Sequence, residues 1–135
     1  MIKIERPPNW DQIVEAFPHA ATLPTLFAYG EDIYNPSAVH IPYALLAHEF
    51  RHCARQFPSN AEAWWTSYIA DPEFRYWEEL LGHVEEYRAQ AVHLSDRNAR
   101  AKLAMRTASR LIAPLYNYQP PRSLQQAMRD LESLV

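Results

Sequence analysis

Residues 42–57 read PYALLAHEFRHCARQF, a stretch that opens with proline and then contains neither proline nor glycine. Proline suits the first turn of a helix, and Pro58 disfavours helical backbone at the residue before it. We therefore predict a helix over about 42–57. Apolar residues in and just before the stretch would seat this helix in a core: Ile41, Ala44, Leu45, Leu46 and Phe50.

The remaining elements follow from apolar spacing and from helix start and stop signals. The sequence Asp71-Pro72-Glu73 combines a capping aspartate, a proline at the first helical position and an early acid. Alternation of apolar and turn residues predicts one hairpin, with strands at 25–29 and 33–34 around Gly30-Glu31. We expect a mainly α fold with a small β-hairpin or sheet, in a single domain over residues 1–135, with further helices at about 10–17, 61–69, 71–93, 96–115 and 123–134.

The central helix carries the pattern HExxH at His48, Glu49 and His52. Residues four apart lie on one face of a helix, so His48 and His52 can bind one metal ion together. In sites of this pattern zinc lowers the pKa of its bound water, and the glutamate accepts the proton. We therefore predict a Zn²⁺ site with Glu49 as its catalytic base.

A catalytic zinc site takes a third protein ligand and keeps one position open. The later acidic helix offers four carboxylates, at Glu78, Glu79, Glu85 and Glu86. At about 100° per residue, Glu85 shares a stripe with apolar residues, whereas Glu86 lies on a more polar stripe with Gly82. A ligand must point inward, so we favour Glu85 as the third ligand, with Glu86 and Glu78 as alternatives.

With these residues the chain resembles the zincin-like metallopeptidases of the gluzincin type. It is most similar to the small HExxH proteins of phages and bacteria, the minimal gluzincins. Three segments carry the resemblance: GEDIYNP at 30–36, LAHEFRH at 46–52 and EEYR at 85–88. It covers about residues 25–92 and implies a His-His-Glu zinc site completed from a later helix, again at Glu85. The helices expected at 96–135 lie outside it and are unassigned.

The leading hypothesis is a zinc-dependent hydrolase of peptide bonds in which Glu49 activates the zinc-bound water. An extended peptide or protein substrate would pair with the edge of the strand at 25–29. Tyr87 is our candidate donor for the developing oxyanion, with His83 and Tyr29 as the other choices. A non-catalytic, metal-stabilised binding or regulatory module stays open as the alternative, in which the C-terminal helices close the fourth metal position.

Composition limits the surroundings in which the chain works. A single cysteine excludes an internal disulfide, and no apolar run approaches the roughly 20 residues that span a bilayer. The first residues lack a secretory signal pattern, so we expect a cytoplasmic protein, in the host cell if phage-encoded. Residues 96–135 hold 7 basic and 3 acidic side chains, too modest an excess for us to expect nucleic acid binding. The oligomeric state is left open.

Overall fold

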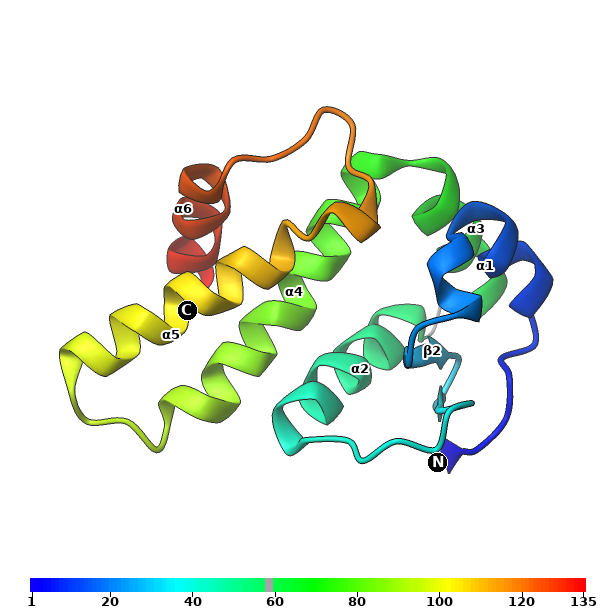
Figure 1. Ribbon diagram of the computed structural model, residues 1–135, viewed down its shortest axis with the longest axis horizontal. Coiled ribbons are helices and arrows are strands. Elements are labelled where there is room, and N and C mark those ends of the chain that lie inside the picture. The colour runs from blue at the N-terminus through cyan, green and yellow to red at the C-terminus, as the bar shows by residue number, and fades with distance from the viewer. Residues whose placement is uncertain (58–59) are drawn as a thin grey trace.

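The computed structural model describes residues 1–57 and 60–135 and is mainly helical with one small sheet (Figure 1). The helices are α1 (Trp10–Ala16), α2 (Tyr43–Gln56), α3 (Ala61–Ala70), α4 (Pro72–Ala91), α5 (Arg97–Leu111) and α6 (Leu124–Leu134), with short 3₁₀ turns η1 (Pro18–Ala21) and η2 (Pro114–Tyr116). The strands are β1 (Ile2–Lys3), β2 (Phe27–Tyr29) and β3 (Asp32–Tyr34). The expected mainly α fold with a small sheet is confirmed.

Side-chain caps fix the starts of four helices, with Asn60 as the cap of α3. Asp71 accepts hydrogen bonds from the backbone N–H groups of Glu73 and Phe74 at the start of α4. Asp96 caps α5 in the same way, and Ser123 caps α6. Such caps satisfy N–H groups that have no partner within the helix, and each contributes about 1 kcal/mol. The starts of α4, α5 and α6 were predicted within one or two residues.

The sheet has the strand order β1-β3-β2. β2 and β3 form the expected antiparallel hairpin, with Ala28 opposite Ile33, and Gly30 in its turn has φ 65°, a left-handed conformation that favours glycine. β1 pairs with β3 in parallel and was not predicted, because two residues are too few to show an alternating pattern. β3 is therefore the central strand, and β2 lies at one edge.

Helices α2 and α4 lie side by side at the centre of the molecule (Figure 1). On the far side of α4, α5 and α6 enclose one apolar core, whose fully buried members include Tyr76, Leu80 and Leu131. A second core, rich in aromatic side chains, joins α1, β2 and α3 through residues such as Ile13 and Trp65. The faces of α2 and α4 that meet between these cores are polar.

The face that α2 buries differs from the apolar face that we expected. Its buried residues are Ala44, His48, Glu49, His52, Cys53 and Gln56. Phe50 is 47% exposed, so the expectation that it would seat the helix in the core was wrong. The side chains of His48, Glu49 and His52 point into the protein, and Phe50 therefore points toward solvent.

Candidate metal centre

His48 and His52 lie one turn apart on the face of α2 that meets α4. Both are buried, and their Nε2 atoms are 2.9 Å apart. The two rings are nearly perpendicular, with centroids separated by 4.7 Å. The helical spacing that predicted the pair thus brings two imidazole nitrogens to one point, as a shared metal ion requires.

Glu79 of α4 completes this group. Its carboxylate lies 3.2 Å from His48 Nε2 through Oε2 and 3.4 Å from His52 Nε2 through Oε1. The Tyr68 hydroxyl donates a hydrogen bond of 2.7 Å to Oε1. Oε2 is buried and, beyond this contact with His48 Nε2, accepts no well-aligned hydrogen bond in the part of the chain that the structure describes. A buried carboxylate oxygen with so little compensation is costly, and a cation at this point would satisfy it.

Gly82 allows α2 and α4 to approach each other closely at the site. A Cβ atom built on Gly82 would lie 2.7 Å from two atoms of the His48 ring, far inside van der Waals contact. Any side chain here would push the two helices apart. One of the chain's two glycines therefore lies where the site needs it.

The expected third ligand, Glu85, is placed elsewhere. Its side chain is 31% exposed and pairs with Arg88 at 3.2 Å on the surface. The alternative Glu78 is buried but pairs with Arg55, at 2.8 Å. Neither carboxylate belongs to a group that could hold a metal ion together with the histidines, among the described residues.

The reason for this difference is the choice of helix face. We expected the apolar stripe of α4 to face α2, but the apolar residues Tyr76, Leu80 and Val84 pack in the core with α5 and α6. The polar stripe with Glu79, His83 and Glu86 faces α2 instead, because the face of α2 is itself polar. Two polar faces pair inside the protein and leave the apolar faces for the cores.

Glu86, the other alternative, reaches the site but contacts the opposite nitrogen of His48. Its Oε1 lies 2.7 Å from His48 Nδ1 and 3.2 Å from His83 Nδ1. His48, His83 and Glu86 form a second group that could hold a metal ion. Metal-bound histidines commonly contact a carboxylate through their other ring nitrogen. His48, His52 and Glu79 are therefore the better ligand set, with Glu86 behind His48.

Electrostatics at the site suit a cation. Burial lowers the pKa of His48, but hydrogen bonds with Glu79 and Glu86 outweigh it and raise that pKa well above its usual value. Burial raises the pKa of Glu79, yet the adjacent His52 and His48 hold it well below its usual range. Burial also raises the pKa of Glu49. His48 and the carboxylate of Glu79 thus favour each other's charged forms, and a divalent ion would favour the charged carboxylate in the same way.

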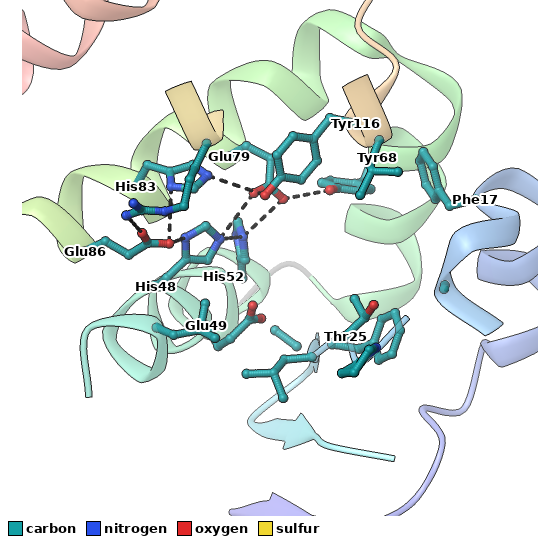
Figure 2. Close-up of a pocket in the computed structure, with 18 of the residues that line it drawn as sticks. Phe17, Thr25, His48, Glu49, His52, Tyr68, Glu79, His83, Glu86 and Tyr116 are labelled. Atoms are coloured by element: carbon teal, nitrogen blue, oxygen red, sulfur yellow. Dashed lines mark hydrogen bonds and ion pairs between the residues drawn. The ribbon is translucent and has the colours of Figure 1, made fainter. Parts of the chain in front are cut away.

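A cavity of about 500 Å³ opens beside these residues (Figure 2). The histidines, Glu49 and Glu79 lie along one wall, and Phe17 and Thr25 lie across the cavity from them. Much of the remaining lining is apolar: Ile13, Ala20, Pro24, Leu26, Phe27, Val39, Trp64 and Leu115. Glu49 therefore lines the same cavity as the candidate ligands, as a catalytic base would need.

Of the three candidate oxyanion donors, only His83 lines the cavity. Tyr87 packs against the core of α4, α5 and α6, and Tyr29 packs against the aromatic core, so neither lines the cavity. His83 does line it, and so does Tyr116 of η2, whose hydroxyl lies 3.4 Å from His83 Nε2. Sequence reasoning missed Tyr116 because the segment around it carries no motif.

The outer edge of β2 is already occupied. The Ala28 carbonyl accepts hydrogen bonds from Gln56 Nε2 at 2.8 Å and from Trp65 Nε1 at 2.9 Å. The N–H group of Gly30 donates to Gln56 Oε1 at 2.7 Å. An extended peptide could pair at Ala28 and Gly30 only by displacing these side chains. The expected pairing surface is therefore closed over this part of the strand.

No helix within the described residues combines the length and the apolar character needed to cross a bilayer. In comparisons with protein-family models, with curated proteins and with solved structures, no significant match to the chain was found. The interpretation of the site therefore rests on its own geometry.

Proposed function

We propose that the protein is a zinc-dependent hydrolase of peptide bonds with a zincin-like arrangement of α2 against α4. His48 and His52 would hold the ion through Nε2, and Glu79 through its carboxylate. The observation that carries the proposal is the meeting of these three buried groups, in which one carboxylate oxygen of Glu79 faces His48 Nε2 without a well-aligned hydrogen bond. Two imidazoles and one carboxylate are a common ligand set for catalytic zinc.

When bound, zinc supplies Lewis acidity and brings the pKa of a coordinated water near neutrality. Glu49 is the base of the proposal: it follows the first ligand in sequence, lines the same cavity and is buried. Its raised pKa makes its carboxylate a better proton acceptor than an exposed glutamate. It would take a proton from the attacking water and later deliver it to the leaving amine.

Tyr116 is the revised candidate for oxyanion stabilisation. Tyr116 lines the cavity with its hydroxyl next to His83, whereas the nearby Tyr68 hydroxyl donates a hydrogen bond of 2.7 Å to Glu79. A neutral phenol can donate a hydrogen bond to a carbonyl oxygen as negative charge develops on it. Burial raises the pKa of Tyr116 well above its usual value, which keeps the donor protonated at neutral pH.

The cavity also indicates which peptides would bind. Beyond the polar wall its lining is mainly apolar and aromatic, and a volume of about 500 Å³ accommodates a large side chain. Burial of such a side chain contributes about 1.5–3 kcal/mol. We expect peptides with a bulky apolar residue beside the scissile bond to be cleaved best.

The test compares three variants for zinc content and for cleavage of a fluorogenic peptide library. His52→Ala should lose zinc, and Glu49→Gln should keep zinc but lose cleavage by at least about 100-fold. Glu85→Gln, on the same helix as Glu79 but on the surface, is the matched control and should behave as the parent. A Glu49→Gln variant that cleaves as fast as the parent would remove the base from the proposal.

A metal-stabilised, non-catalytic module is the second candidate, favoured by the depth of the site. His48, His52 and Glu79 are each at most 4% exposed. Zinc bound there would link α2 to α4 and add its binding energy to folding. Zinc at one ion per chain and a strong rise in thermal stability, without cleavage of any library peptide, would favour this module over the hydrolase.

A further inference from the structure

Helix α5, in the segment that sequence analysis left unassigned, sends one side chain toward the metal centre. Arg110 Nη2 donates a hydrogen bond of 2.6 Å to Glu86 Oε2. The other oxygen of Glu86, Oε1, lies 2.7 Å from His48 Nδ1. One carboxylate therefore connects a cation on α5 with a candidate ligand on α2, and Figure 2 shows Glu86 beside His48.

The contact differs from an ordinary surface ion pair because its acidic partner is buried. The Glu86 side chain is 5% exposed, whereas that of Arg110 is 47% exposed. Exposed pairs contribute about 0–1 kcal/mol, but removing one partner of a buried charge leaves that charge uncompensated and costs several kcal/mol. Arg110 thus contacts one oxygen of the buried Glu86 carboxylate, and His48 and His83 contact the other.

Glu86 in turn determines how His48 presents its nitrogens. The Glu86 carboxylate lies 2.7 Å from Nδ1, a position that favours a proton on that nitrogen and a lone pair on Nε2, which faces His52 and Glu79. The perpendicular ring of His83, with its centroid 4.7 Å away, packs against His48 from the side. The ring is held by a contact at one nitrogen and by packing on its face.

We propose that Arg110 and Glu86 are positioning residues of the metal centre: Arg110 holds Glu86, and Glu86 fixes the tautomer and orientation of His48. Helix α5 is then part of the zinc site, although none of its residues binds the ion. This inference rests on the proposed zinc site at His48, His52 and Glu79. It gives one residue of the basic C-terminal segment a function.

The test measures zinc affinity by competition with a chromophoric chelator, and folding of the metal-free protein by circular dichroism. Arg110→Met should weaken zinc binding by about 10- to 100-fold, as loss of an outer contact to a metal-bound histidine does. Arg110→Lys keeps the charge but loses the planar guanidinium, so its zinc affinity should lie between those of the parent and Arg110→Met. Arg106→Met, an exposed position one turn earlier on α5, is the matched control and should bind zinc as the parent does.

A double-mutant comparison separates positioning from general damage. In a Glu86→Gln background, Arg110→Met should cost little further affinity, because the two residues act through one contact. The visible spectrum of the Co²⁺-loaded protein should shift in Arg110→Met and not in Arg106→Met.

Two results would contradict the reasoning at different levels. Zinc bound equally well by the parent, Arg110→Met and Arg110→Lys would overturn the positioning role and leave the zinc site standing. Failure of the parent itself to bind zinc would overturn the proposed site, and this inference with it.

Discussion

The close approach of α2 and α4 at Gly82 makes a sharp prediction for Gly82→Ala. A Cβ atom at this position would lie 2.7 Å from His48 Cε1 and Nε2 and 2.8 Å from Cδ2. Optimal separations are about 3.5–4.0 Å, so the ring or the helix must retreat by roughly 1 Å. His48 cannot turn aside easily, because His52 and His83 flank it at centroid distances of 4.7 Å. We expect α4 to move away from α2.

Two opposing effects determine the stability of this variant. Alanine in a helix interior is favoured over glycine by about 0.8–1.0 kcal/mol. Overpacking in a close-packed core costs typically about 1–3 kcal/mol. The free energy of unfolding should therefore fall by about 0–2 kcal/mol, a modest change for a substitution that ordinarily stabilises helices.

Zinc affinity should respond far more strongly than stability does. Metal–ligand distances are tolerated within about 0.2 Å, so a retreat of roughly 1 Å would remove Glu79 from the coordination sphere. Urea unfolding of the metal-free protein measures its stability, and chelator competition measures its zinc affinity. Glu85→Ala, a neighbouring position on the outer face of α4, should leave zinc affinity unchanged. A Gly82→Ala variant that gains about 1 kcal/mol of stability and binds zinc as the parent does would refute the described packing.

Three further predictions concern the surroundings of the site. Arg75 is buried and donates to backbone carbonyls of α3 and of the η2 segment, so Arg75→Met should lower the free energy of unfolding by at least about 2 kcal/mol in urea titrations. Gln56→Leu leaves the Gly30 N–H group without its acceptor and should lower the free energy of unfolding by about 1–3 kcal/mol in the same assay. Interactions that raise the pKa of His48 stabilise the metal-free protein fully below the usual histidine pKa of about 6.5, and this contribution is lost as pH rises through the folded pKa. Zinc must displace that proton, so zinc affinity should increase with pH in chelator titrations between pH 6 and 8, and a flat profile would contradict the assignment of His48.

Local signals were sufficient to predict most of the helices and half of the site. The caps at Asp71 and Asp96 act within one turn, so the sequence alone locates the starts of α4 and α5. His48 and His52 face one direction because four residues separate them, whatever the rest of the chain does. Such features need no knowledge of tertiary structure.

The rest of the site depends on which helix faces meet, and no local pattern determines that. Glu79 and Glu85 lie on one helix and differ only in direction, so a rule that turns apolar stripes inward selects Glu85. The rule fails because α4 has two buried sides, one packed against apolar cores and one against the histidines. Arg110 and Tyr116 reach the site from more than 24 residues beyond Glu85 in sequence. Their place follows only from the packing of α5 and η2 on α4.

The buried polar layer between α2 and α4 is itself an argument for function. Glu49, Glu79 and Glu86 are all at most 7% exposed, and Arg110 is the one cation of permanent charge that contacts them within the described residues. Buried charges seldom stabilise a fold as well as apolar residues of the same size would. A core built for stability alone would have continued the apolar packing of Leu80 and its neighbours across this interface. Carboxylates and imidazoles kept at one point beside a cavity therefore make a site that could hold a cation, at the expense of some stability in its absence.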